Sequence, residues 1–218
     1  MVLGLASVAH ADLIVNAPGT GSTRTDVWTA EAGGSMPAGT GGFVDGTLFV
    51  TSAGLYTFIA GGNGLVPGDS NHGDSVFPNE FKILGNIFCT QNDPACGGVK
   101  TPVGTKFTLF LPVGPIPFTL AFGPTTNNTL TNGQVNDAVG ASIAECGPVS
   151  PAGTTGAQAG PCTTAYIGLS DSPYPADHDF QDLVVTVVKT PEPSALLLLG
   201  LGLIGGIFVG RKRKDLAA

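Results

Sequence analysis

Short apolar stretches recur along the central part of the chain and are separated by clusters of glycine, proline and asparagine. Two of them alternate clearly, since residues 107–111 read FTLFL and residues 118–122 read FTLAF. A period of two is typical of β-strands, and no central segment shows a sustained helical period. Many short strands joined by glycine-rich turns predict an all-β domain, either a sandwich or a jelly roll.

The same pattern predicts where the strands and turns lie. We expect strands at residues 47–51, 55–60, 81–88, 106–111, 117–122, 139–145, 165–169 and 183–189. Residues 52–54, SAG, are expected to form a hairpin turn between the first two strands, and Asn132-Gly133 is a second turn signal.

An apolar run near the C-terminus predicts a membrane span. Residues 195–210, ALLLLGLGLIGGIFVG, contain no charged or polar side chain. As a helix the run would be about 24 Å long, against about 30 Å of hydrocarbon. Four consecutive cations follow it, Arg211, Lys212, Arg213 and Lys214. They could complete the span by snorkelling and predict a C-terminus that faces the cytoplasm. We expect one transmembrane helix at residues 194–210.

The N-terminal residues 1–11, MVLGLASVAHA, predict a signal peptide. They are apolar and end in Ala-His-Ala, which fits the small-x-small rule for cleavage between Ala11 and Asp12. No lysine or arginine precedes Arg24, so the positive start of a signal peptide is missing and we expect the true start upstream. A buried N-terminal strand is the alternative. The expected organisation is a signal peptide (1–11), a β domain (12–189) and a sorting segment (190–218).

The charge balance argues against nucleic acid as a partner. Residues 12–189 contain five Lys and Arg and fourteen Asp and Glu, a net charge of −9. A nucleic-acid binder needs a basic face to neutralise phosphates.

Four cysteines predict two local disulfides. An even count in an exported chain favours disulfides, and the pairs Cys89–Cys96 and Cys146–Cys162 each bracket a turn-rich loop. A zinc site is the rival, but the CxxC-type spacing that it favours is absent.

Aspartates gather just before the last expected strand. Asp171, Asp177, Asp179 and Asp182 lie within twelve residues. Carboxylates this close repel one another unless a cation or hydrogen-bond donors neutralise them. Dense carboxylate oxygens favour Ca²⁺, so we expect these four residues to be metal ligands. Two alternatives stay open, turn capping by the aspartates and catalytic carboxylates. A second acidic loop, residues 69–74, has Asp74 where a calcium loop requires glycine, and is expected to be a solvated loop.

The C-terminal segment carries a family resemblance. Pro191, Glu192 and Pro193 precede the apolar run and its basic cluster. This order resembles the PEP-CTERM sorting signal of Gram-negative bacteria, a signal also catalogued as an ice-binding protein C-terminal domain. The resemblance implies export, transient insertion into the inner membrane, processing by an exosortase, and association with the cell surface and extracellular polysaccharide. The ice-binding label belongs to the signal and implies nothing about the β domain.

The aspartate segment carries a second resemblance. Residues 177–185, DHDFQDLVV, are similar to a D-x-D-[FY]-x-D-[LMV]-V-[VF] signature near the end of many exported bacterial β domains, among them domain of unknown function 4114. The resemblance implies that the aspartates bind calcium or stabilise a turn. Gln181 stands where those domains commonly carry Asn or Asp, which weakens a calcium geometry that depends on that position.

Signatures of catalysis are absent from the sequence. There is no G-x-S-x-G, no H-E-x-x-H and no Walker loop. We therefore expect a non-enzymatic cell-surface or extracellular-matrix protein with no catalytic residues. One alternative is a carbohydrate-binding module that uses Trp28, Tyr56, Tyr166 and Tyr174, which a row of exposed rings on one sheet would favour. The other is a hydrolase, which would need two acids facing a cleft, with Glu31, Glu80 and Glu145 as the available glutamates.

Overall fold

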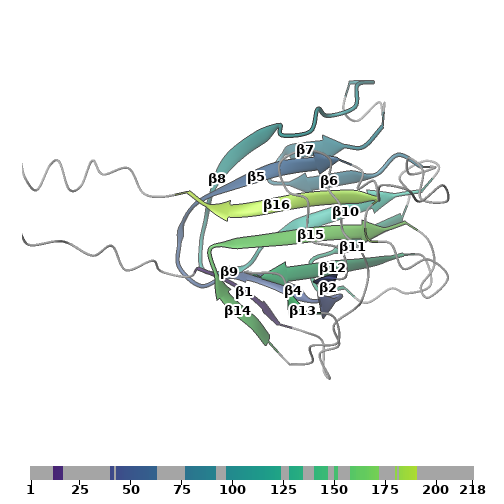
Figure 1. Cartoon of the computed structure of the whole chain (residues 1–218). Coiled ribbons are helices and arrows are strands. Elements are labelled where there is room, and N and C mark those ends of the chain that lie inside the picture. The colour runs from purple at the N-terminus through teal and green to yellow at the C-terminus, as the bar shows by residue number, and fades with distance from the viewer. Residues whose placement is uncertain are drawn as a thin grey trace, which may run out of the picture.

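The structure is a computed structural model, and the part of the chain that it describes is all-β. It describes residues 12–16, 40–41, 43–62, 77–91, 97–123, 128–134, 140–146, 150–151, 158–171, 180 and 182–190. Within these ranges there is no helix, and every strand pair is antiparallel. The all-β prediction is therefore confirmed, and Figure 1 shows how the strands are arranged.

The largest sheet has six strands in the order β3-β12-β15-β16-β5-β8. Its members are β3 (Phe43–Val44), β12 (Ala141–Cys146), β15 (Thr164–Ser170), β16 (Leu183–Lys189), β5 (Gly54–Gly62) and β8 (Lys106–Leu111). The last strand of the chain, β16, is central, because it pairs with β15 on one side and with β5 on the other. The register of β16 against β5 shifts at Val184, where Gly61 lets the backbones approach; a Cβ on Gly61 would lie 3.0 Å from the Val184 carbonyl oxygen.

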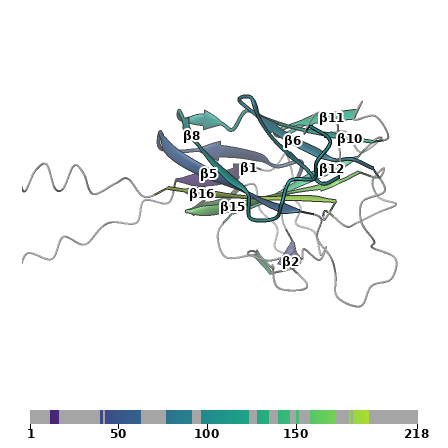
Figure 2. The same ribbon diagram turned by 90° about the horizontal axis from the view of Figure 1, so that it is seen from above.

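Three smaller sheets complete the described fold. One has the order β14-β1-β4-β9, a second the order β11-β10-β6-β7, and β13 pairs with β2. Their members are β1 (Leu13–Asn16), β2 (Thr40–Gly41), β4 (Thr47–Val50), β6 (Glu80–Ile83), β7 (Asn86–Cys89), β9 (Gly114–Pro115), β10 (Phe118–Phe122), β11 (Asn128–Thr131), β13 (Ser150–Pro151) and β14 (Gln158–Cys162). Figure 2 shows the sheets from above, with β10 and β11 on the opposite side of the core from β15 and β16.

One hydrophobic core joins the three main sheets. Its centre is aromatic: Phe58 of the six-stranded sheet lies 5.8 Å, between ring centroids, from Phe81 of the β11-β10-β6-β7 sheet. The Phe88 and Phe107 rings lie 4.7 Å apart between centroids and are likewise tilted relative to each other. Leu13 and Leu48 of the third sheet are fully buried in the same cluster. Burial of such side chains is the main stabilising term for a fold without helices.

The expected strand at residues 81–88 is wrong. The chain forms two strands there, β6 and β7, which pair through Phe81–Phe88 and Ile83–Asn86 as a hairpin. The turn lies at Leu84 and Gly85, which have φ angles of 45° and 82°. Two consecutive residues with positive φ suit a tight hairpin turn, but a leucine is a poor sequence signal for one. The turn lies on the surface and leaves Leu84 60% exposed.

The expected hairpin at residues 52–54 is also wrong. The turn exists, but it joins β4 in one sheet to β5 in another. β4 pairs instead with β1 and with β9, which the sequence analysis did not predict. The chain therefore crosses between layers at Ser52, and the Tyr56 hydroxyl fixes the crossing by donating to the Ser52 carbonyl oxygen at 2.7 Å.

The remaining expected strands are confirmed with small shifts of their ends. Two agree in both bounds, residues 106–111 and 183–189. The strands β11 and β14 were missed, as were the two-residue strands β2, β3, β9 and β13. β14 reads QAGPC, and its glycine and proline are tolerated because it lies at the edge of its sheet.

One asparagine side chain ties two sheets together. The Asn132 carboxamide accepts a hydrogen bond from the Leu48 N–H at 2.8 Å and donates to the carbonyl oxygens of Leu48 at 2.8 Å and Ile116 at 2.9 Å. It thus pairs with β4 as a strand backbone would. The neighbouring Gly133 has a φ of 77°, and a Cβ there would collide with Thr47. The Asn132-Gly133 turn signal is confirmed by the Gln134 N–H donating to the Thr131 carbonyl oxygen at 2.9 Å.

Candidate functional site

Two of the four predicted metal ligands are brought together. Asp171 follows the end of β15, and Asp182 precedes the start of β16. The Asp171 N–H donates to Oδ2 of Asp182 at 2.8 Å, and the Asp182 N–H donates to the Leu169 carbonyl oxygen at 3.1 Å. Asp177 and Asp179 lie outside the described residues. The described contacts close the base of the loop between the two strands.

A third residue, Asn79, joins this base and was missed by the sequence analysis. Its buried side chain donates to Oδ2 of Asp171 at 3.0 Å and to the Asp182 carbonyl oxygen at 3.3 Å. Only its position just before β6 could have drawn attention to it. Hydrogen bonds from N–H groups to carboxylates are what turn capping requires. Among the residues that the structure describes, no group of three or more His, Cys, Asp or Glu side chains could hold a metal ion.

A second polar cluster lies at the opposite end of β16, where the described chain begins and ends. The Lys189 ammonium lies 2.8 Å from Oδ2 of Asp12 and donates to the Ser52 hydroxyl at 2.8 Å. The Ser52 hydroxyl in turn donates to Oδ1 of Asp12. The Asp12 side chain is only 2% exposed and the Lys189 side chain 18% exposed. We call Asp12, Ser52, Tyr56 and Lys189 the end cluster.

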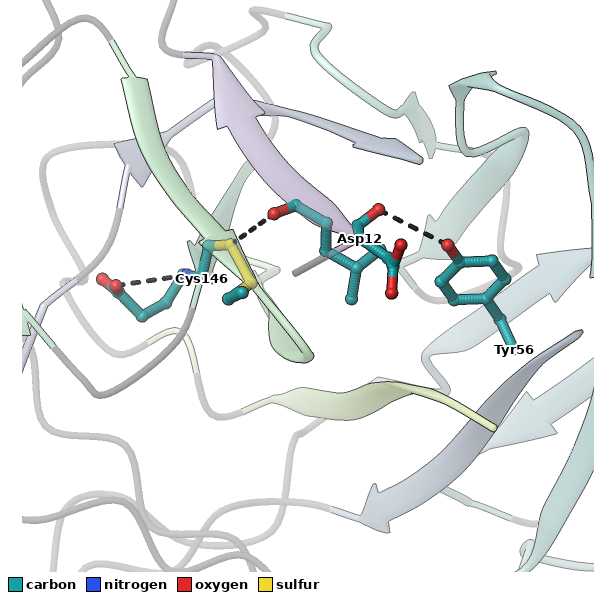
Figure 3. Close-up of a disulfide and its surroundings, with 6 residues drawn as sticks. Asp12, Tyr56 and Cys146 are labelled. Atoms are coloured by element: carbon teal, nitrogen blue, oxygen red, sulfur yellow. Dashed lines mark hydrogen bonds between the residues drawn. A yellow bond between two sulfur atoms is a disulfide. The ribbon is translucent and has the colours of Figure 1, made fainter. Parts of the chain in front are cut away.

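Tyr56 covers the end cluster from the core side. Its hydroxyl donates to the Asp12 carbonyl oxygen at 3.4 Å, a contact drawn as a dashed line in Figure 3, and its ring is fully buried. Burial raises the pKa of Tyr56 to about 12; the hydrogen bond with Ser52 lowers it by a smaller amount, and the nearby Asp12 carboxylate raises it by a smaller amount still. The phenol is therefore neutral at physiological pH and donates its proton to the turn.

The end cluster holds both ends of the described domain at the same place. The Thr51 N–H donates to the Asp12 carbonyl oxygen at 2.8 Å, and the Thr190 N–H donates to the Leu55 carbonyl oxygen at 2.8 Å. Figure 1 shows the start of β1 and the end of β16 on the same side of the fold. Asp12, predicted as the first residue after signal-peptide cleavage, is thus the residue to which the last strand is ion-paired. Ala11 lies outside the described residues.

The predicted disulfide Cys146–Cys162 is confirmed. It joins the ends of β12 and β14, with a Cα–Cα distance of 5.6 Å, and both cysteines are buried. Figure 3 shows the bridge beside β1, where Sγ of Cys146 lies 3.1 Å from the Leu13 carbonyl oxygen. Cys89 is also disulfide-bonded, while Cys96, its predicted partner, lies outside the described residues.

The candidates for carbohydrate binding and hydrolysis find little support in the described part of the chain. Tyr56 is buried in the core, so the prediction that it is a sugar-binding ring on the surface is wrong. Tyr166 is partly buried, and Trp28 and Tyr174 lie outside the described residues. Glu80 and Glu145 are fully buried, Glu80 beside the ammonium of Lys82, and Glu31 is not described. An open hollow of about 420 Å³ lies on the β6–β7 hairpin, but none of its lining residues is aromatic.

The comparisons with known proteins concern the C-terminal segment. Residues 189–214 match the PEP-CTERM protein-sorting motif. The chain carries a PEP-CTERM sorting motif. The matched segment begins at Lys189, which is the last residue of β16 and a member of the end cluster. The PEP-CTERM segment therefore starts inside the end cluster. The match does not reach the aspartate segment, whose family resemblance therefore stays a prediction. No curated protein and no solved structure matches the chain.

Most of the PEP-CTERM segment lies outside the described residues. These include Pro191, Glu192 and Pro193, the expected transmembrane helix at 194–210, and the cluster Arg211, Lys212, Arg213 and Lys214. Among the residues that are described, no helix is long and apolar enough to cross a membrane. The motif itself indicates an exported protein that an exosortase processes.

Proposed function

We propose that this chain is a non-enzymatic protein of the cell surface or extracellular matrix. It is held for a time in the inner membrane by its C-terminal segment and is released by exosortase cleavage into surroundings rich in extracellular polysaccharide. The observation that carries the proposal is the PEP-CTERM match at residues 189–214, which begins where the last strand ends. The apolar run and basic cluster supply a membrane span with a cytoplasmic end.

The proposal is tested on material from a host that expresses an exosortase. Mass spectrometry of released protein should find no peptide beyond about Ser194, whereas the membrane fraction should contain peptides up to Ala218. Replacing Pro191, Glu192 and Pro193 together by alanine should hold the protein in the membrane fraction. A matched change in the β domain, Thr129→Ala at an exposed position of β11, should leave release unchanged. Released protein that ends at Ala218 would contradict the proposal.

We also propose that the aspartate segment binds one Ca²⁺. The proposal is supported by Asp171 and Asp182, which the fold brings together although they are eleven positions apart in the sequence. Asp177 and Asp179 lie between them in the sequence and add two carboxylates. Calcium accepts irregular sites with six to eight oxygen ligands. The rival interpretation is that the carboxylates act only as turn caps, as the bond from the Asp171 N–H illustrates.

Melting of the full chain in calcium and in chelator separates the two interpretations. Calcium at about 100 times its dissociation constant adds about 2.7 kcal/mol, which should raise the melting temperature by about 5–10 °C. Asp179→Ala should abolish this difference and leave the chelated protein no less stable, because a repelling charge is removed. An unchanged melt in chelator, with Asp179→Ala destabilising the chelated protein, would identify the aspartates as turn caps.

A further inference from the structure

The end of the fold that carries the end cluster presents a surface of its own. We call it the terminal face and define it by residues 51–55, 110–114, Thr163 and Thr190. Hydrogen bonds and strand pairing place these segments together. Leu55 lies opposite Phe110 in the β5–β8 pair, the Thr190 N–H donates to the Leu55 carbonyl oxygen, and the Lys189 N–H donates to the Thr163 carbonyl oxygen at 3.1 Å.

The terminal face exposes large apolar side chains. Phe110 and Val113 are each 64% exposed and Leu55 is 37% exposed. Their neighbours Ala53 and Pro112 are exposed as well. Phe110 is not part of the hydrophobic core, because its side chain lies on the outer side of the edge strand β8. Apolar side chains gathered in one place on a soluble surface mark a contact with a partner or a membrane.

The terminal face is electrically neutral in an acidic domain. None of the residues that define it carries a charge, and the charged side chains of the adjoining end cluster, Asp12 and Lys189, are ion-paired with each other. The rest of residues 12–189 holds four Lys and Arg and thirteen Asp and Glu. A membrane with anionic lipids repels such a domain everywhere except at a neutral face.

The chain itself brings this face to a bilayer. Thr190 lies on the terminal face, and the apolar run starts at Ala195, five residues later. Five residues reach at most about 18 Å. The polar headgroup layer on one side of the hydrocarbon is about 5–8 Å thick. A domain tethered this tightly cannot leave the membrane surface while residues 195–210 span it.

We propose that the terminal face rests on the phospholipid bilayer that holds this chain's own C-terminal segment. Phe110, Val113 and Leu55 enter the headgroup layer, and the acidic remainder of the domain points away from it. The inference rests on the membrane insertion proposed above. Docking in this way would orient the domain so that the Pro191–Pro193 segment lies at the membrane surface, where a membrane-embedded protease acts.

Depth-dependent fluorescence quenching tests the inference on the full chain. In a Trp28→Phe background, a single indole is introduced by Val113→Trp or by Phe110→Trp. The matched control is Val99→Trp, because Val99 is also a 64% exposed valine but lies before the other end of β8. Phe208→Trp in the apolar run reports insertion itself. Each protein is reconstituted into phosphatidylethanolamine–phosphatidylglycerol vesicles with or without brominated acyl chains.

We expect brominated lipid to quench the indoles at positions 113 and 110 at least about two-fold, since aromatic rings sit at the membrane interface, and to leave the indole at position 99 unquenched. Quenching at position 208 with equal, weak quenching at 113, 110 and 99 would overturn the docking and leave the proposed function intact. No quenching at position 208 would overturn the insertion and the docking together. The melting temperature of each variant, compared with the Trp28→Phe parent, shows that the fold is kept.

Discussion

Lys189 is the residue at which the β domain passes into the PEP-CTERM segment, and it is also the partner of a buried carboxylate. Its ammonium contacts both Asp12 and Ser52. A charge buried without a partner costs far more than the pair contributes. Replacing Lys189 should therefore lower the stability of the domain more than is usual for a residue at the end of a strand.

Replacing Lys189 by methionine should destabilise the domain by about 3 kcal/mol, because Asp12 would remain buried without its counter-charge. Urea unfolding with intact disulfides measures the change. The double variant Asp12→Asn/Lys189→Met removes both charges and should recover most of the loss. If the single and double variants are equally unstable, the ion pair is not the cause.

Tyr56 should make stability fall at alkaline pH. Its pKa is raised from 10.0 to about 12 in the folded state, so the folded protein keeps a proton that the unfolded chain loses. The stabilisation, about 2–3 kcal/mol at most, is complete below pH 10 and is lost as the pH rises towards 12. Urea unfolding at pH 9, 10 and 11 should show a steeper decline for the wild type than for Tyr56→Phe. Parallel declines would mean that another group dominates.

At the scale of single residues, the sequence predicted some neighbours and could not predict others. Asp171 and Asp182 were expected to meet because only a short loop separates them. Cys146 and Cys162 were expected to pair for the same reason. The contact between Asp12 and Lys189 was not predicted, since it depends on two strands that meet only after the sheets have formed.

At the scale of elements, the Asn132 side chain makes the hydrogen bonds to β4 that the backbone of a neighbouring strand would otherwise make. Its carboxamide satisfies the N–H and C=O of Leu48 and the C=O of Ile116. Backbone polar groups that lose their partners in a part-buried site cost about 1–3 kcal/mol each. The turn after β11 thereby holds two sheets that share no strand.

Asn132→Ala should lower the free energy of unfolding by about 1–3 kcal/mol, because it leaves the Leu48 N–H without its acceptor, whereas the Leu48 and Ile116 carbonyl oxygens still accept from the Ile116 and Phe118 N–H groups. Asn132→Asp keeps an acceptor for the Leu48 N–H but loses both donors, so it should also be destabilising. Asn86→Ala, on the exposed β6–β7 hairpin, is the matched control and should cost less than about 1 kcal/mol. A cost for Asn132→Ala no larger than that of the control would contradict this role.

Strands were predicted well where the chain carries a clear apolar pattern, either alternating or continuous, and poorly where it does not. The alternation in residues 106–111 gave β8 in full, and the apolar run of residues 183–189 gave β16. The β6–β7 turn was missed because Leu84 adopts a positive φ that leucine rarely takes. β14 was missed because a strand containing glycine and proline carries no periodic signal.

At the scale of the whole molecule, the fold depends on links between parts distant in sequence. The Cys146–Cys162 bridge closes a loop with a sequence separation of 16 and ties β12 of one sheet to β14 of another. The order of strands in the sheets could not be predicted, because neighbours such as β16 and β5 are far apart along the chain. Local patterns specify strands, whereas their order follows from which apolar faces fit together in the core.

Replacing Cys146 and Cys162 together by alanine should cost about 3 kcal/mol, the loop-closure value for about 15 residues. Chemical unfolding of the double variant, followed by tryptophan fluorescence and by circular dichroism, measures the loss. The single replacement Cys146→Ala should be at least as unstable, because it also leaves a free thiol at Cys162. A double variant as stable as the wild type would show that β1 and its neighbours hold the two strands without the bridge.

The central position of β16 determines how the domain bears a mechanical load. A pull on the chain beyond Thr190 acts along the axis of β16, which is hydrogen-bonded on both sides, to β15 and to β5. Such a force shears two ladders at once and cannot open them bond by bond, as it would if the strand lay at an edge. The domain is thus attached to its C-terminal segment through a strand that is held on both sides.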